Sequence, residues 1–307
     1  MKGLVIKNTG SWYQVRTDLE EIFECKIKGN LRLKDIKSTN PIAVGDFVEF
    51  TAIEEKVGLI SGIYDRKNYI IRRSSNLSKQ SHILAANLDL VVLVITIRYP
   101  ETSTVFIDRF IASAEAYNVP ACILINKTDL YTEDEMQYAE ALKTLYESIG
   151  YPVFMLSAIK PDTFDTFKQF LTGKTILISG NSGVGKSTLI NAILPESLAK
   201  TGEISSYHNK GTHTTTFSQL YQLENGAQLI DTPGIKGFGT VDMEADEISH
   251  YFKEIFRTSE KCRFTNCTHV HEPGCAVLTA VENHQISLSR YQSYLSILSD
   301  FKTGKYR

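Results

Sequence analysis

The sequence contains no apolar run of membrane-spanning length. The longest candidate, residues 88–97, includes Asp89 and has about the length of one buried strand. The N-terminus, MKGLVIKNTGSW, also lacks the long apolar core and small-residue cleavage site of a secretory signal. We therefore expect a cytoplasmic protein with reduced thiols and no membrane attachment.

An excess of charge of one sign is lacking too, because 33 Lys and Arg residues stand against 35 Asp and Glu residues. The molecule as a whole is therefore not a general polyanion binder, and any RNA contact needs a local basic patch. From the residues alone, an ordinary solvated surface is the better interpretation of the basic candidates. These are Lys26, Lys28, Arg32, Lys34 and Lys37, with Arg72 and Arg73 further along.

Cysteine is scarce, and three of the five cysteines fall within one short segment. In a cytosolic chain such a cluster indicates metal binding rather than disulfides. Cys262, Cys267, His269 and Cys275 supply three sulfurs and one imidazole, a complete tetrahedral set for one structural Zn²⁺. His271 is a rival to His269, and unliganded buried cysteines are the alternative to a metal site.

Internal repeats and low-complexity tracts are absent, and 307 residues suggest two or three domains. Residues 1–68 read as short strands separated by turns, which predicts a β-barrel of about five strands, suited to an OB-fold. Residues 69–87 form a polar linker. Residues 88–242 alternate apolar strands with helices, which predicts a mostly parallel sheet covered on both faces. Residues 243–307 read as helical around the cysteine cluster.

A phosphate-binding motif stands between a predicted strand and a predicted helix. Residues 180–187 match G-x-x-x-x-G-K-[ST], whose backbone N–H groups surround phosphate at a helix N-terminus. Lys186 is expected to reach the β- and γ-phosphates, and Ser187 to bind Mg²⁺. The predicted nucleotide contacts are Gly180, Asn181, Ser182, Gly183, Val184, Gly185, Lys186, Ser187 and Thr188.

Two further segments are expected to meet the γ-phosphate and Mg²⁺. Asp231 ends an apolar strand and can hold Mg²⁺ through water, while the N–H of Gly234 can sense the γ-phosphate. The long segment 195–216 lacks clear periodicity and ends in a threonine cluster, of which we favour Thr215 as the metal ligand. Thr214 and Thr216 compete with it, and a solvated polar loop is the alternative.

The base-reading motif is Asn126-Lys127-Thr128-Asp129, which follows the apolar strand 121–125. The Asp129 carboxylate can accept hydrogen bonds from N1–H and the exocyclic amine of guanine, a donor pair that adenine lacks. Asn126 and Lys127 brace the loop, and Ser157-Ala158 resembles a second guanine-contacting motif. Because these motifs precede the phosphate loop, the order is circularly permuted relative to ordinary small GTPases. Loops at the carboxyl ends of the strands can still gather around one nucleotide.

The permuted motifs NKTD, SA, GNSGVGKST and DTPG, the preceding barrel and the C-x4-C-x-H-x5-C segment together resemble the RsgA family, also called YjeQ or YloQ. The resemblance covers essentially the whole chain. It implies an OB-fold, a permuted GTPase domain and a C-terminal zinc-finger domain, using GTP or GDP with Mg²⁺. It also implies late maturation of the small ribosomal subunit, with rRNA binding and subunit-stimulated GTP hydrolysis.

Ile235 stands where Ras-like enzymes have a glutamine that orients the attacking water, so we expect slow intrinsic hydrolysis. His213 is a candidate for that role, although a packed or solvated histidine is an equally good interpretation. The alternative function is a GTP-dependent RNA-binding module with little turnover. We expect a monomer that meets the small subunit and other late assembly factors.

Overall fold

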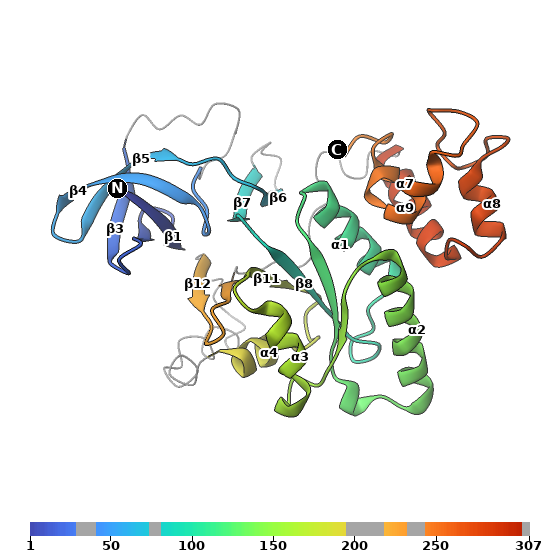
Figure 1. Cartoon of the computed structure of the whole chain (residues 1–307), viewed down its shortest axis with the longest axis horizontal. Helices are drawn as coiled ribbons and strands as arrows, with labels where there is room; N and C mark the ends of the chain where they lie inside the picture. Colours follow the sequence, from blue (N-terminus) through green and yellow to red (C-terminus); the bar gives the residue numbers. More distant parts are fainter. Residues whose placement is uncertain (29–40, 74–80, 195–217, 232–242, 303–307) are drawn as a thin grey trace.

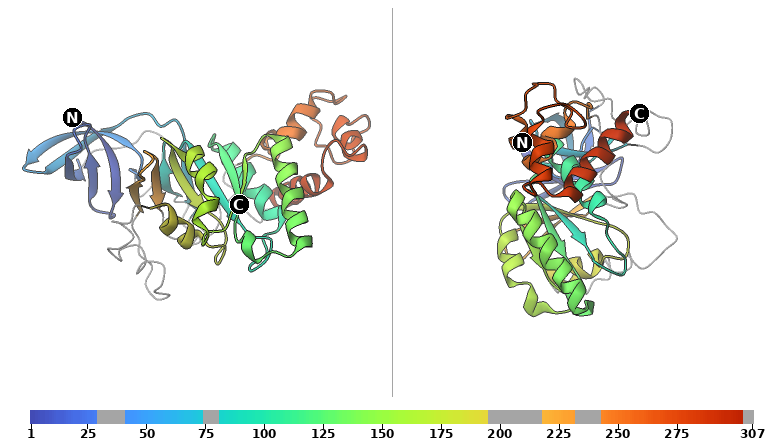
Figure 2. Two further views of the ribbon diagram at one scale, coloured as in Figure 1. Left: turned by 60° about the horizontal axis from the view of Figure 1, so that its bottom comes forward. Right: turned by 90° about the vertical axis from the view of Figure 1, so that its right-hand side faces the viewer.

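Three bodies follow one another along the chain. The computed structural model describes residues 1–28, 41–73, 81–194, 218–231 and 243–302. Figure 1 shows a β-barrel, a central α/β body and a C-terminal helical body arranged in a row. The left view in Figure 2 keeps the same order, with the α/β body in the middle. Within the described ranges, no helix has the length and apolar character needed to cross a membrane.

The first body is a closed barrel, as the sequence predicts. Its strands pair in the order β1-β2-β3-β5-β4, and β4 pairs back onto β1. The alternation in β3 gives the barrel an apolar interior, because Phe23 and Cys25 point into the core while their neighbours face outward. Tyr13 and Phe50 complete that core from facing strands. The strands are β1 Lys2–Asn8, β2 Tyr13–Arg16, β3 Ile22–Ile27, β4 Phe47–Glu54 and β5 Val57–Ile63.

Residues 69–87, predicted as a polar linker, contain a two-stranded antiparallel sheet of β6 (Tyr69–Arg73) and β7 (Ser81–Ala86). Ile70 and Ala85 are fully buried, and the N–H of Ala86 donates to the carbonyl of Val44 at the edge of the barrel. The short apolar alternation in this stretch therefore forms strands because packing against both neighbouring bodies stabilises it.

The central sheet has the strand order β10-β9-β8-β11-β13-β12. Among these strands only β12 is antiparallel to its neighbour, as expected where helices connect successive strands. The strands are β8 Leu90–Ile95, β9 Ala121–Ile125, β10 Val153–Met155, β11 Thr175–Ser179, β12 Ser218–Gln222 and β13 Gln228–Asp231. The helices are α1 Thr104–Ala116, α2 Glu133–Ile149, α3 Asp165–Leu171 and α4 Lys186–Ile193.

Every residue of β8 is buried, because helices cover both faces of the sheet. Val91 and Leu93 share a core with α1 and α2, whereas Val92 and Val94 share a core with α3 and α4. The prediction of a mostly parallel sheet with helices on both faces is confirmed.

The barrel and the central sheet are continuous through one strand pair. The end of β1 pairs antiparallel with β12, with Lys7 opposite Gln219 and Asn8 opposite Ser218. This pairing joins the barrel to the central strands in one eleven-stranded sheet.

The C-terminal body is helical, with α7 (Lys253–Ser259), α8 (Ala276–Glu282) and α9 (Leu288–Lys302) around a core that includes Phe252 and Tyr294. Ala112 of α1 belongs to the same core, so this body packs directly on the α/β body. Short 3₁₀ turns complete the described elements, at Thr128–Leu130, Pro161–Thr163 and Ile248–Tyr251.

Candidate functional site

Three of the predicted nucleotide loops lie at one edge of the central sheet. Residues 126–129 follow β9, residues 157–158 follow β10 and residues 180–187 follow β11. Because these strands are parallel, their carboxyl ends point to the same edge, which is where ligands bind in open α/β sheets.

Asn126 joins the three loops through hydrogen bonds. Its side chain donates from Nδ2 to the carbonyl of Val184 (2.8 Å) and accepts at Oδ1 from the N–H of Ala158 (2.9 Å). Its backbone N–H donates to the carbonyl of Ile95, the last residue of β8 (2.9 Å). The side chain is 1% exposed, so a polar group buried this deeply needs these partners. Asn126 therefore holds the base-reading, Ser157 and phosphate loops in fixed positions relative to one another.

Asp129 and Lys127 are also held by neighbouring loops. The hydroxyl of Ser157 donates to Oδ1 of Asp129, which orients the carboxylate. Lys127 has a left-handed backbone (φ 64°) and donates from Nζ to the carbonyls of Gly183 (2.7 Å) and Tyr99 (2.6 Å). The N–H of Thr128 donates to the carbonyl of Leu156, the residue directly after β10 (3.3 Å).

Glycine is required at two positions of the phosphate loop. Gly180 has φ +147°, and a Cβ there would lie 2.2 Å from the carbonyl oxygen of Val94. Gly185 has φ +95°, and a Cβ there would lie 2.4 Å from Nδ2 of Asn126. The loop can therefore pass this close to β8 and Asn126 only without side chains at these positions.

Lys186 folds over its own loop, donating from Nζ to the carbonyls of Gly180 (2.8 Å) and Asn181 (2.6 Å). Burial lowers the pKa of its ammonium, since the charged form is poorly solvated there. Ser187 and Thr188 occupy the first turn of α4, half-buried and exposed respectively, and Ser182 is exposed. Such a lysine could exchange carbonyl partners for phosphate oxygens.

The remaining predicted phosphate-sensing residues are placed only in part. Asp231 is half-buried at the end of β13, directly after Ile230, whose register partner is Leu177 of β11. Thr215 and Gly234 lie outside the described residues. So do His213, Thr214, Thr216 and Ile235.

A second cluster lies in the C-terminal body. The ligand atoms of Cys262, Cys267, His269 and Cys275 all fall within 4.8 Å of one another. Nδ1 of His269 is 3.7 Å from Sγ of Cys262 and 3.5 Å from Sγ of Cys275. His269 is 2% exposed, whereas the rival His271 is exposed. Three thiols and one imidazole converging in this way could hold a metal ion.

Hydrogen bonds hold the loop that carries this cluster. The hydroxyl of Tyr291 on α9 donates to the carbonyl of His269 (2.7 Å), and that of Tyr294 donates to Thr268 (2.8 Å). The carboxylate of Glu272 accepts hydrogen bonds from the hydroxyl and N–H of Thr268 and from the N–H of Val270. Burial alone would raise the pKa of this carboxyl, but these hydrogen bonds hold it well below the usual range. His269 itself has φ 56°. Hydrogen bonds from α9 thus hold the backbone at Thr268 and His269.

Sequence reasoning missed three residues that matter to this arrangement. Tyr131 and Tyr99 contact the base-reading loop, and Arg290 joins the C-terminal body to α1. The proximity of Tyr131 to the NKTD motif was a signal for the first. The other two contacts join residues far apart in the sequence, and no motif marks them.

Comparison with known proteins gives consistent results over the whole chain. A family model described as RsgA GTPase matches residues 63–241, and one described as RsgA N-terminal domain matches residues 2–60. The chain is 65% identical to the small ribosomal subunit biogenesis GTPase RsgA of Phocaeicola vulgatus, covering 100% of this chain and 99% of that protein.

Two solved structures are similar as well. YjeQ from Thermotoga maritima is 36% identical, with a TM-score of 0.79 and 97% of each chain covered. YloQ, described as a circularly permuted GTPase, is 30% identical, with a TM-score of 0.78, 100% of this chain covered and 96% of YloQ.

Proposed function

This chain belongs to the RsgA family of GTPases, and we propose that it hydrolyses GTP to GDP and phosphate during late maturation of the small ribosomal subunit. One observation carries the nucleotide part of the proposal. Asn126 ties the NKTD, Ser157-Ala158 and phosphate loops together at one edge of the sheet. A single nucleotide there can touch its base-reading and phosphate-binding residues at once.

In this proposal, guanine is read by Asp129, whose carboxylate the hydroxyl of Ser157 already orients. The backbone N–H at Ala158 faces the same loop, and the stem of Lys127 covers the base. A base without guanine's N1–H and amine donors, such as adenine, would leave the partly buried carboxylate with only the Ser157 hydroxyl as a donor, which is the source of strong discrimination.

The phosphates are bound by the backbone of residues 180–187, by Lys186 and by the N-terminus of α4. Magnesium supplies charge neutralisation at the β- and γ-phosphates, and Ser187, Asp231 and Thr215 are the residues proposed to hold it. Gly234 is proposed to sense the γ-phosphate. With Ile235 in place of a water-orienting glutamine, intrinsic turnover is slow and depends on stimulation by the partner.

The metal of the C-terminal body is proposed to be one structural Zn²⁺ held by Cys262, Cys267, His269 and Cys275. Three sulfurs and one nitrogen suit zinc, and four protein ligands leave no position for substrate. We also propose domain limits of 1–68, 88–242 and 243–307, with residues 69–87, which contain β6 and β7, connecting the first two domains.

The proposed partner is the small ribosomal subunit, which the names of the relatives specify for those proteins. We propose rRNA as the ligand of the barrel. Of the basic candidates there, Lys26 and Lys28 are described and exposed, and Lys26 Nζ lies 4.2 Å from the Trp12 ring centroid. A basic group beside a half-buried aromatic ring suits phosphate and base contacts. The protein is further proposed to act as a monomer and to meet other late assembly factors on the subunit.

The test is GTP turnover with and without purified small subunits, for the wild type and Lys186→Ala. Stimulation in the wild type and its loss in the variant are expected. Asp134→Asn, an exposed change on α2, is the matched control and should behave as the wild type. Negligible turnover under all conditions with intact GTP binding would instead favour a GTP-dependent RNA-binding module.

A further inference from the structure

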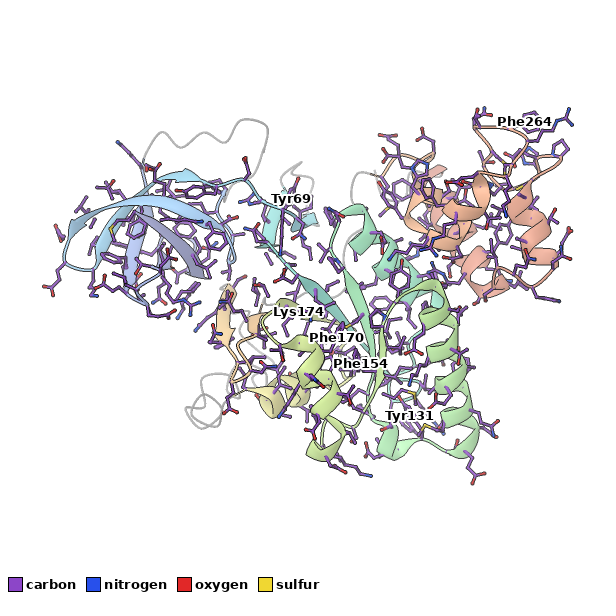
Figure 3. The ribbon with its side chains drawn as sticks, in the orientation of Figure 1. Tyr69, Tyr131, Phe154, Phe170, Lys174 and Phe264 are labelled. Atoms are coloured by element: carbon purple, nitrogen blue, oxygen red, sulfur yellow. The ribbon has the colours of Figure 1, made fainter. Side chains whose placement is uncertain are left out.

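The hydroxyl of Tyr131 (labelled in Figure 3) bridges two loops at the edge of the nucleotide site. It donates to the carbonyl of Asn126 (2.5 Å) and accepts from the N–H of Ile97 (2.9 Å). Tyr131 lies two residues after Asp129, between the base-reading motif and α2. One hydroxyl therefore satisfies a backbone acceptor of the base-reading loop and a backbone donor of the loop that follows β8.

The loop after β8, residues 96–103, is held in shape by its own hydrogen bonds. The Thr96 hydroxyl donates to the carbonyl of Pro100 (2.5 Å), and the N–H of Thr102 donates to the carbonyl of Thr96 (3.0 Å). Ser103 then caps α1, accepting from the N–H of Phe106. The loop closes on itself before the helix begins.

The same loop contacts the nucleotide site at a second point. The carbonyl of Tyr99 accepts from Nζ of Lys127, which also donates to Gly183 of the phosphate loop. A Cβ at Gly183 would lie 3.4 Å from Cδ of Pro100. Residues 96–103 therefore line the phosphate loop as well as the base-reading loop.

We propose that Tyr131 is a positioning residue for guanine-nucleotide binding, because its hydroxyl fixes the NKTD loop against the 96–103 loop. This inference rests on the proposed function, since it takes residues 126–129 as the guanine site. Tyr131 touches neither base nor phosphate in this scheme. It acts through the backbone carbonyl of Asn126. It also acts through the 96–103 loop, because the carbonyl of Tyr99 in that loop accepts a hydrogen bond from Lys127.

The expected effect follows from the population of binding-competent conformers. Without the hydroxyl, the carbonyl of Asn126 and the N–H of Ile97 lose their shared partner. The two loops then separate more readily, and the apparent dissociation constant rises by the inverse of the competent fraction. Burial raises the pKa of Tyr131 to about 12, so the hydroxyl keeps its proton and can donate throughout the physiological range.

The experiment compares wild-type protein with Tyr131→Phe, which keeps the ring and removes only the hydroxyl. Dissociation constants for GTP and GDP are measured by calorimetry, and kcat and KM are measured for subunit-stimulated turnover. Both dissociation constants are expected to rise about tenfold, the equivalent of 1.4 kcal/mol. KM should rise with them while kcat stays unchanged, because the hydroxyl does not contact the reacting phosphate.

Tyr138→Phe is the matched control, because Tyr138 is 48% exposed on α2. It should leave all four quantities unchanged. Amide hydrogen exchange gives a second readout, since Tyr131→Phe should deprotect the N–H of Ile97 while that of Val92 in the centre of β8 stays protected.

Unchanged nucleotide affinity in Tyr131→Phe would overturn the inference, and so would a fall in kcat at constant affinity. If wild-type protein itself failed to bind GTP, the proposed function would be wrong. The two failures are therefore distinguishable in one set of titrations.

Discussion

Nη1 of Arg290 lies 2.7 Å from Oδ1 of Asp108, and this ion pair joins the C-terminal body to helix α1 of the α/β body. Both side chains are at most 1% exposed. Arg290 also donates to both carboxylate oxygens of Glu254, and Asp108 accepts from the hydroxyl of Tyr146 on α2. One buried cation thus connects α9 and α7 with α1 and α2, the helices that follow the loops of the nucleotide site.

Removing that cation should strongly destabilise the protein. Arg290→Met leaves the buried carboxylate of Asp108 and the half-buried carboxylate of Glu254 without their cation, so the free energy of unfolding should fall by about 3–5 kcal/mol. Urea unfolding followed by circular dichroism measures the change. Arg98→Met is the matched control, because Arg98 is 54% exposed in its pair with Glu135, and such pairs contribute about 1 kcal/mol or less. Equal losses in the two variants would contradict a buried network.

Changing the base-reading carboxylate should change nucleotide specificity. Asp129→Asn replaces an acceptor pair with one acceptor and one donor, which matches the 2-oxo group of xanthine rather than the amine of guanine. GTP affinity should fall by about 100-fold or more while affinity for xanthosine triphosphate rises. Competition binding with both nucleotides measures the switch. A variant that still prefers GTP would place the guanine site elsewhere.

A methyl group at Gly185 should disrupt the site from the phosphate-loop side. In Gly185→Ala the new Cβ meets Nδ2 of Asn126 and breaks its hydrogen bond to Val184, so nucleotide affinity should fall at least about tenfold. Gly173→Ala is the control for backbone strain alone. Gly173 also has positive φ (+68°), but its Cβ would have nothing within 4 Å. If both variants bound nucleotide equally well, the close approach to Asn126 would be unimportant.

Metal content should distinguish His269 from His271, the two histidines of the loop that carries the cysteine cluster. Elemental analysis of purified protein is expected to give about one zinc per chain, and His269→Ala should lose most of it. His271→Ala should retain it, because His271 is exposed and outside the cluster. A strong chelator should unfold the C-terminal body, since ligand binding and folding are coupled in small zinc sites. Full zinc occupancy in His269→Ala would refute the ligand set.

The chemistry of this protein could be predicted from short segments of its sequence. NKTD, the phosphate loop and the spacing of the cysteines each place their reactive groups within a few residues, so local sequence carries the information. The alternation of apolar strands and helices also predicted the parallel sheet, because burial on both faces demands continuous apolar strands such as β8.

Other features needed the tertiary structure. The segment 69–87 read as a polar linker, yet it pairs as β6 and β7 because Val44 of the barrel and the neighbouring core supply partners that its own composition does not reveal. The sequence already favoured His269 over its rival His271, and the structure places the buried His269 in the cluster while His271 is exposed.

Local patterns predicted which groups read guanine, surround phosphate and bind metal. The way these groups are held together comes from the fold. Asn126 and Val184 are separated by 58 positions, Ile97 and Tyr131 by 34, and Asp108 and Arg290 by 182. Such contacts depend on how strands and helices pack around a common core, and no spacing within the sequence encodes them.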